Sequence, residues 1–142
     1  MSKILGIDYG RKRIGIAIAD PQVRLAIPLR VVEGRNDVTR DARNVADIAM
    51  SEEASELVVG LPLNMDGSES EQTALTRRFA HELARLSKRP VHLQDERLSS
   101  VAADEVLGAA NVDRRRRRGL IDRIAAQKIL QAYLDCGQSP SP

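Results

Sequence analysis

Asp8 is an acidic residue inside an apolar strand pattern, in the stretch Gly6-Ile7-Asp8-Tyr9-Gly10. An ionised carboxylate among apolar neighbours is costly to bury unless it is paired or binds a metal ion. Glycines on both sides would let a bulky partner approach the backbone closely. Arg11-Lys12-Arg13 follow directly and offer positive charge to a phosphate. We therefore expect Asp8 to hold a hard cation that faces a polyanion.

Glu96 and Asp122 are the other two acidic residues in unusual positions. Glu96 lies just past the end of a predicted parallel strand, where open α/β sheets bind their ligands. Asp122 lies on a helical stripe with Ala126 and Ile129 that otherwise faces the core. Carboxylates without a Cys or His pattern favour one or two Mg²⁺ or Mn²⁺ ions, and two such ions about 4 Å apart can hydrolyse a phosphodiester. We therefore expect Asp8, Glu96 and Asp122 to be both catalytic and metal-binding.

Each of these carboxylates also has a simpler structural explanation. Asp8 would cap a turn, Glu96 would pair with Arg97 or a neighbouring helix, and Asp122 would lie at a helix start, where the dipole favours it. Asp95 competes with Glu96, because adjacent strand residues point to opposite faces. The sequence leaves open which of these two neighbours faces the site.

Positive charge is concentrated in one run, although the net charge is only +2. Such clustering is typical of nucleic-acid binding, because adjacent like charges repel unless an anion relieves them. We expect this run to form a loop that contacts backbone phosphates. Aromatic residues are too few for a base-stacking platform. The run consists of Arg114, Arg115, Arg116, Arg117 and Arg118.

The composition is that of a globular protein, with 142 residues, 42% of them apolar and 30% charged. We expect a single domain over residues 1–136 and a disordered Gly/Ser/Pro-rich tail over residues 137–142. No stretch resembles a membrane span or a signal peptide, and one cysteine, Cys136, fits a reducing cytoplasm.

The first part of the chain predicts three short strands in an antiparallel meander. Pro28 suggests that the third strand lies at a sheet edge or contains a bulge. These strands are expected at residues 4–8, 14–19 and 24–32.

The remainder predicts helices alternating with two further strands, and hence an α/β fold with a mixed five-stranded sheet and helices on both faces. Ser68 with Glu71 fits a capping box for the second helix. Ser99 or Ser100 is expected to cap a third helix. The expected helices cover residues 37–54, about 68–87, 99–107 and 120–134, and the strands residues 57–61 and 90–93.

Four stretches in order resemble the YqgF family, also called RuvX: GIDYGRKRIGIAIAD, VVGLPLNMDGS, DERLSS and IDRIAAQKIL. The resemblance implies an RNase H-like fold and metal-dependent cleavage of nucleic acid in the cytoplasm. By motif position, the family's acidic residues fall on Asp8, Glu96 and Asp122. The usual Thr pair is replaced by Ser99-Ser100, which keeps the hydroxyl groups. Within that fold, Arg11, Arg13 and Arg97 would contact phosphate, although Arg97 is nearly as well explained by a surface salt bridge.

The function favoured by these patterns is a nuclease for structured RNA, and the resemblance implies 5′-end maturation of the pre-16S ribosomal RNA. One alternative is cleavage of four-way DNA junctions, which requires a two-fold homodimer. Another is a nucleic-acid-binding module without activity. The expected partners are thus structured RNA or branched DNA and no membrane, with a homodimer as an option.

Overall fold

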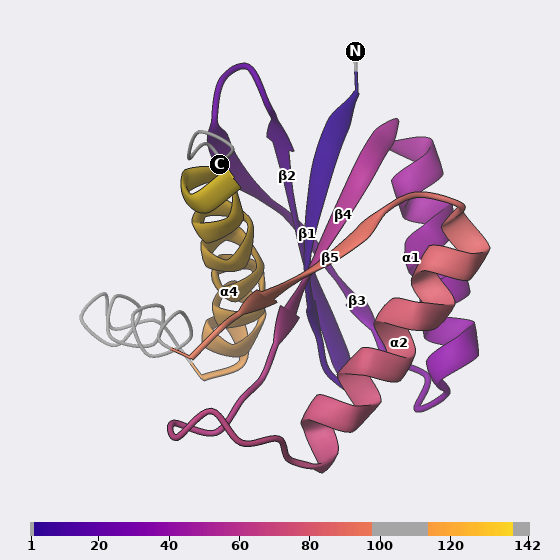
Figure 1. The fold of residues 1–142 in the computed structure, drawn as a ribbon, viewed down its shortest axis with the longest axis vertical. Helices are drawn as coiled ribbons and strands as arrows, with labels where there is room; N and C mark the ends of the chain where they lie inside the picture. The colour runs from indigo at the N-terminus through magenta and orange to yellow at the C-terminus, as the bar shows by residue number, and fades with distance from the viewer. Residues whose placement is uncertain (1, 98–113, 138–142) are drawn as a thin grey trace.

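The computed structural model describes residues 2–97 and 114–137, which form a three-layer α/β fold (Figure 1). Five strands form one sheet in the order β3-β2-β1-β4-β5. This arrangement confirms the expected mixed sheet. The third helix expected at residues 99–107 lies outside the described residues, as do residues 138–142 of the expected tail.

The first half of the sheet is an antiparallel meander of β1 (Lys3–Tyr9), β2 (Arg13–Asp20) and β3 (Leu25–Glu33). The register shifts between Ile16 and Ala17, which pair with Arg30 and Pro28. Pro28 therefore sits beside a bulge on an edge strand, where its missing N–H costs no ladder bond. Both expectations for this proline are confirmed.

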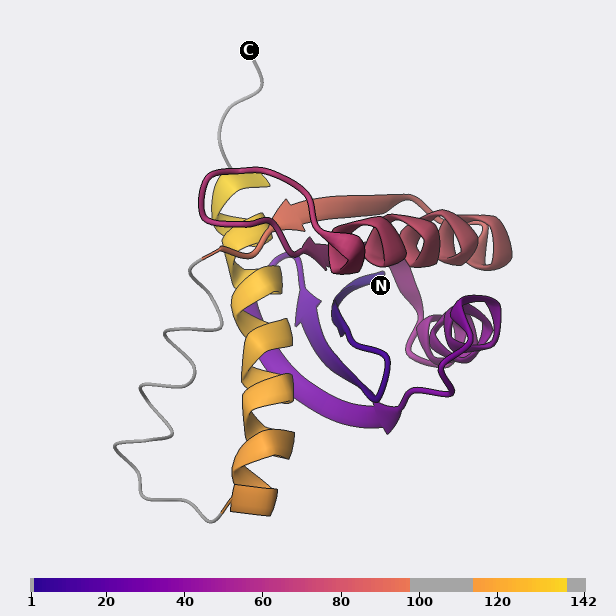
Figure 2. The ribbon, with the colours of Figure 1, turned by 90° about the horizontal axis from the view of Figure 1, so that it is seen from below.

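The second half adds β4 (Ala54–Leu61) and β5 (Val91–Asp95), which run parallel to β1. Helices α1 (Val38–Ser51) and α2 (Glu71–Ser87) connect these strands and cover one face of the sheet (Figure 2). The core beneath them is built from branched and aromatic side chains, and its largest fully buried members are Phe79, Leu5, Ile7, Ile14 and Ile16.

Helix α4 (Arg114–Gly137) covers the opposite face alone (Figure 2). Ala126, Ile129 and Leu130 of α4 pack there against small residues of the sheet. The loop expected at Arg114–Arg118 is wrong, because these residues form the first turns of α4. Arginine has a high helix propensity, so the helix continues through the charged run instead of ending at it.

The start of α2 also differs from expectation. Its N-cap is Ser70, whose side chain accepts a bond from the backbone N–H of Thr73 in a capping box. Ser68 instead donates its hydroxyl to Asp66. The chain forms a bridge between Leu63 and Glu69, so the helix cannot begin before residue 70.

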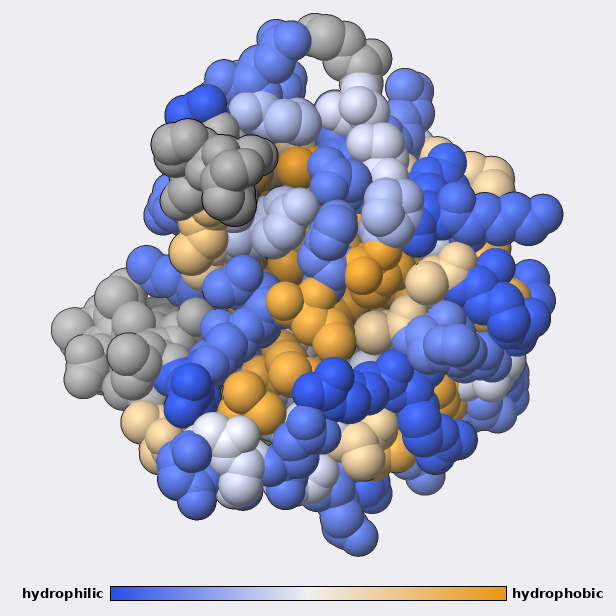
Figure 3. Space-filling view, in the orientation of Figure 1, coloured by the Kyte–Doolittle hydropathy of each residue, from blue (hydrophilic) through white to orange (hydrophobic). Residues whose placement is uncertain are grey.

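The surface over the β5 edge combines hydrophilic and apolar side chains (Figure 3). Leu93 of β5 is among the exposed large apolar residues. Within residues 2–97 and 114–137, no helix has the length and apolar character needed to cross a bilayer.

Candidate active site

Asp8 and Glu96 meet at one edge of the sheet. Because β1, β4 and β5 run parallel, their carboxyl ends lie at this edge. Glu96 directly follows β5, and its backbone N–H donates to the carbonyl of Leu61 at the end of β4 (3.3 Å). The carboxyl groups of Asp8 and Glu96 are close enough to share a hydrogen bond. Two acidic residues far apart in sequence are thus brought into contact.

The structure also answers which of the neighbours Asp95 and Glu96 faces this point. Asp95 is exposed and pairs with Arg97 (Nη2 to Oδ2, 2.7 Å), whose backbone N–H it also accepts (3.0 Å). Glu96 points the other way, toward Asp8. The simpler explanation that paired Glu96 with Arg97 is therefore wrong, since Asp95 takes that partner.

Both carboxyl groups at this edge hold their protons more tightly than usual. Burial is the main cause of the raised pKa of Asp8, about 6, and the charge of Asp122 adds to it. Burial and the neighbouring charge of Asp8 raise the pKa of Glu96 to about 8. A protonated Glu96 can donate its hydrogen bond to the Asp8 carboxylate, so near neutral pH the pair tends to share one proton.

Helix α4 positions Asp122 through an unusually close contact with the sheet. A Cβ at Gly15 of β2, the residue paired with Asp8, would overlap the carbonyl oxygen of Asp122. A Cβ at Gly60 of β4 would similarly overlap the carboxylate of Glu96 and the side chain of Ile129. These glycines lie on β2 and β4, the strands on either side of β1, and let the helix lie directly on the sheet beside Asp8.

The glycines beside Asp8 have different uses from the one expected. The partner that approaches Gly6 is helix α4, at Leu130. Gly10 belongs to a tight turn, where a Cβ would lie 2.7 Å from the carbonyl oxygen of Arg13. Asp122 lies about two turns into α4, so the helix dipole does not explain its position either.

Arg13 forms an ion pair with Asp122, with 2.6 Å between Nε and Oδ2. Asp8, Arg13 and Asp122 together line a hollow of about 340 Å³. Arg11 and Lys12 lie on its rim, in the turn between β1 and β2. The backbone N–H of Gly34 donates to the carbonyl of Lys12 (2.8 Å) and so fixes this turn.

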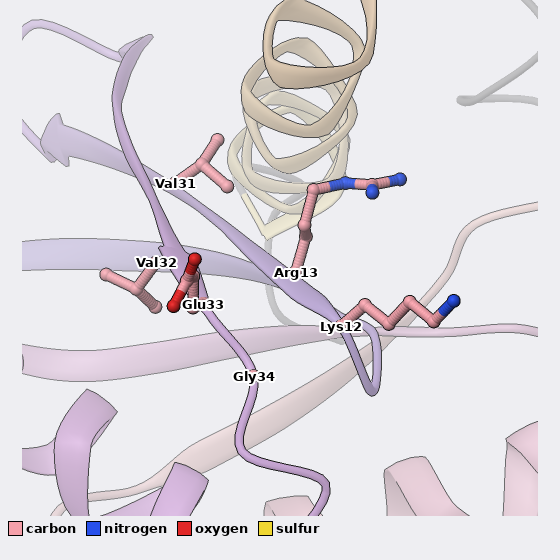
Figure 4. Close-up of a pocket in the computed structure, with 6 residues that line it drawn as sticks. All are labelled: Lys12, Arg13, Val31, Val32, Glu33 and Gly34. Carbon is pink, nitrogen blue, oxygen red and sulfur yellow. The ribbon is translucent and has the colours of Figure 1, made fainter. Parts of the chain in front are cut away.

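A second hollow, of about 460 Å³, lies beside the first and shares Lys12 and Arg13 with it. Its other wall comes from Val31, Val32 and Glu33 at the end of β3 (Figure 4). Lys12 and Arg13 therefore form a basic ridge between two concave surfaces. A chain of phosphates crossing this ridge would meet positive charge on its path from one hollow to the next.

The acidic side chains at this edge fit a hard divalent cation, but only two of the three are placed to bind it together. Asp8 and Glu96 offer oxygen ligands, and a cation between them would replace the shared proton and relieve the repulsion that raises both pKa values. Asp122 is held by Arg13, and among the described residues no three acidic, His or Cys side chains converge on one point. Asp122 is therefore fully available to such a site once its ion pair with Arg13, which holds Oδ2, opens.

A family model described as "RuvX: Holliday junction resolvase" matches residues 2–136. The chain belongs to the RuvX family. A relative in Rhodopseudomonas palustris (strain BisB5), named "Putative pre-16S rRNA nuclease", is 46% identical over 93% of this chain and 82% of its own length. A protein of the same name in Myxococcus xanthus (strain DK1622) is 43% identical over 97% of this chain and 91% of its own. These names agree on a nuclease, a hydrolase of ester bonds.

The fold of this RuvX chain is similar to that of a solved RuvC structure. The structure titled "T. thermophilus RuvC in complex with Holliday junction substrate" aligns with a TM-score of 0.58 at 17% identity. The alignment covers 98% of this chain and 97% of that one. The likeness confirms the expected RNase H-like fold.

The remaining site residues expected in this RuvX chain fall into two groups. Arg11 and Arg13 line the hollow, as expected of phosphate contacts. Arg97 is occupied by Asp95 and by the carbonyl of Met65 (3.2 Å), which favours the salt-bridge explanation. Arg114–Arg118 open α4, and their side chains lie outside the described part of the structure.

Sequence reasoning missed three residues of this RuvX site. Lys12 lines both hollows, although it was visible within the basic triplet. Gln72 reaches the first hollow from α2 and donates to the carbonyl of Tyr9 (3.3 Å), and nothing in its local sequence marks it. Gly15 was marked only by being a glycine inside an apolar strand.

Proposed function

We propose that this protein is a divalent-metal-dependent nuclease that processes the 5′ end of the pre-16S ribosomal RNA in the cytoplasm. The observation that carries the proposal is the half-buried carboxyl pair of Asp8 and Glu96 beside a basic ridge. A protein that only bound polyanions would gain nothing from acidic groups at this point. The names of the RuvX relatives supply the substrate.

The residues of the chain divide the work as follows. Asp8 and Glu96 would hold Mg²⁺ or Mn²⁺, and Asp122 would join them. The bound ion would polarise the phosphodiester and stabilise the charge that develops on it. Arg11 and Lys12 bind and orient the phosphates on either side. Arg13 exchanges its partner Asp122 for a phosphate, so substrate binding itself frees the third carboxylate.

The experiment is a cleavage assay on RNA that spans the precursor 5′ end, with Mg²⁺ or Mn²⁺ present. Wild-type protein should cut this RNA, and Asp8→Asn should lose activity by at least a hundredfold. Asp47→Asn, an exposed carboxylate of α1, is the control and should cut normally. Equal activity of wild type and Asp8→Asn would refute the proposed site.

Cleavage of four-way DNA junctions is the second candidate, favoured by the description of the family model and by the RuvC-like fold. Paired symmetric incisions require a two-fold dimer. Sedimentation at working concentration, combined with a junction substrate in the same assay, separates the candidates. A monomer that cuts the RNA precursor and leaves junctions intact supports the RNA nuclease.

A further inference from the structure

The connection between β4 and α2 projects from the carboxyl edge of the sheet (Figure 1). It is closed by the Leu63–Glu69 bridge and by a bond from the backbone N–H of Asn64 to the carbonyl of Ser68 (2.9 Å). The side chain of Asn64 donates to the Ser68 hydroxyl (2.9 Å), and Ser68 in turn donates to Asp66 (2.6 Å). The polar groups of this loop are thus largely used to hold its own shape.

Arg97 fastens this projection to the candidate active site. Its Nη1 donates to the carbonyl of Met65 (3.2 Å), while its other nitrogen atoms bond to Asp95. Arg97 directly follows Glu96 in the chain. The tip of the loop is therefore held at a fixed position relative to the carboxyl pair.

Met65 lies at this tip with 72% of its surface exposed. Other exposed large apolar residues of the described chain lie elsewhere: Leu25 begins β3 at the opposite edge, and Met50 lies in the last turn of α1 near the start of β4. Leu93 lies within β5. Among the exposed large apolar side chains described within residues 2–97 and 121–136, only Met65 is presented at the carboxyl edge.

The chemistry of the loop suits a base better than a phosphate. Its ionisable side chains, Asp66 and Glu69, are acidic, and both guanidinium groups that touch the loop are already paired, Arg97 with Asp95 and Arg77 with Glu69. Tyr9 and Phe79 are buried, so no aromatic ring is exposed at this edge of the described structure. A thioether is polarisable and makes favourable contacts with aromatic rings, and methionine is among the side chains that wedge against bases.

We propose that Met65 packs against the face of an unpaired base next to the phosphate that is cleaved. This inference rests on the proposed RNA nuclease function. The hydrogen-bonded loop holds the backbone at Met65, so that little backbone conformational entropy is lost on contact. Met65 would thereby fix which phosphate enters the site.

The chain contains three methionines, which makes the contact directly visible by NMR. Full-length protein with ¹³C-labelled methionine methyl groups is mixed, in EDTA, with an RNA hairpin that carries a single-stranded 5′ extension. The Met65 signal should shift, whereas the signal of Met50, a comparably exposed methionine at the opposite edge, should stay in place. Single Ala substitutions assign the two signals.

A second RNA separates contact with the base from contact with the backbone. In this hairpin the extension is abasic, so its phosphates remain and its bases are missing. Binding should persist, but the Met65 shift should vanish. A Met65 signal that stays in place with the normal hairpin, or moves equally with the abasic one, overturns the proposal.

Cleavage gives an independent readout. Met65→Ala should lower kcat/KM by about tenfold and spread the cuts over neighbouring phosphates, since stacking on a base is worth about 1–3 kcal/mol. Met65→Leu should retain most of the activity, and Met50→Ala should behave as wild type. A Met65→Ala variant that cleaves at the wild-type rate and at the wild-type phosphate would refute the role of Met65. If wild type binds the hairpin and never cuts it, the nuclease function fails, whereas a base-dependent Met65 shift still supports the contact.

Discussion

Asp8 and Glu96 repel each other once both are ionised, and burial adds to the cost of each charge. Asp8→Asn removes one charge, so in EDTA at pH 8 we expect the free energy of unfolding to rise by about 1–2 kcal/mol and the Tm by several degrees. Thermal unfolding of this variant beside Asp47→Asn measures the effect. A variant that melts no higher than wild type would show that residue 8 carries no such strain. A higher Tm would instead mean that Asp8 lowers the stability of the fold, as is common for residues that are kept for activity.

The same pair predicts a pH dependence. The folded-state pKa values of Asp8 and Glu96, about 6 and about 8, lie above those of the unfolded chain. The folded protein therefore binds more protons than the unfolded one, and the stability contributed by the pair is present at about pH 4 and declines as the pH rises to about 8.

The measurement is the difference in unfolding free energy between wild type and Asp8→Asn/Glu96→Gln across this range, because the subtraction removes the other titrating groups. Without metal, the unfolding free energy of wild type should fall further below that of the double variant as the pH rises. Mg²⁺ or Mn²⁺ should reduce it most at the upper end, where both ligands are deprotonated. A pH-independent difference would contradict the raised pKa values.

Arg13 and the metal compete for Asp122 in the proposed mechanism. Arg13→Gln should therefore bind Mn²⁺ more tightly in the absence of RNA, while its KM for RNA rises several-fold because a phosphate contact is lost. Calorimetric titration with Mn²⁺ tests the first effect and cleavage kinetics the second. Arg85→Gln, which breaks the comparable Arg85–Glu82 surface pair, is the matched control. Weaker Mn²⁺ binding by Arg13→Gln would exclude the competition.

At the scale of elements, the contact between α4 and β2 decides where Asp122 lies. Gly15→Ala would push the helix backbone away, so we expect it to destabilise the fold by about 1–3 kcal/mol and to reduce cleavage more than this loss of stability explains. Urea unfolding and activity are measured together. Ala17→Gly, a buried neighbour on the same strand, should lower stability by a smaller amount and keep activity. A fully active Gly15→Ala would show that the close contact does not position the site.

The elements that could be predicted from sequence are those fixed by local rules. The β1–β3 meander and the bulge at Pro28 follow from strand patterns and from the missing N–H of proline. The helix start at Ser68 was wrong because a competing bond to Asp66 and the Leu63–Glu69 bridge are not visible in the cap pattern. The expected loop at Arg114–Arg118 is wrong because the helix propensity of arginine outweighs the repulsion between the clustered charges.

The candidate site also contains residues that the local sequence predicts and residues that it does not. Asp8 could be singled out because a charge inside an apolar strand is a local anomaly. The choice of Glu96 over Asp95 depended on strand register, and the Arg13–Asp122 pair depended on how α4 docks on Gly15. Both are consequences of tertiary packing, which no local pattern contains.

At the scale of the whole molecule, binding should be dominated by charge. Replacing all five arginines from Arg114 to Arg118 with Ala should make the plot of log K against log salt concentration less steep by up to about 3–5. Fluorescence anisotropy with labelled RNA in EDTA measures the slope. Replacing Arg43, Arg85 and Lys88, which lie away from the hollows, should change it little. An unchanged slope in the five-residue variant would remove this segment from the interface.

Among the described helices, α4 is the one that covers this side of the sheet, and it carries the last of the three acidic residues. During translation Asp8 emerges early, and Asp122 follows only after roughly 5–20 s of further synthesis. Until then the nascent chain lacks both the third carboxylate and the cover over one hydrophobic surface. A nascent chain that has not yet reached Asp122 would therefore lack the full proposed site, and cutting should begin only after helix α4 has been synthesised.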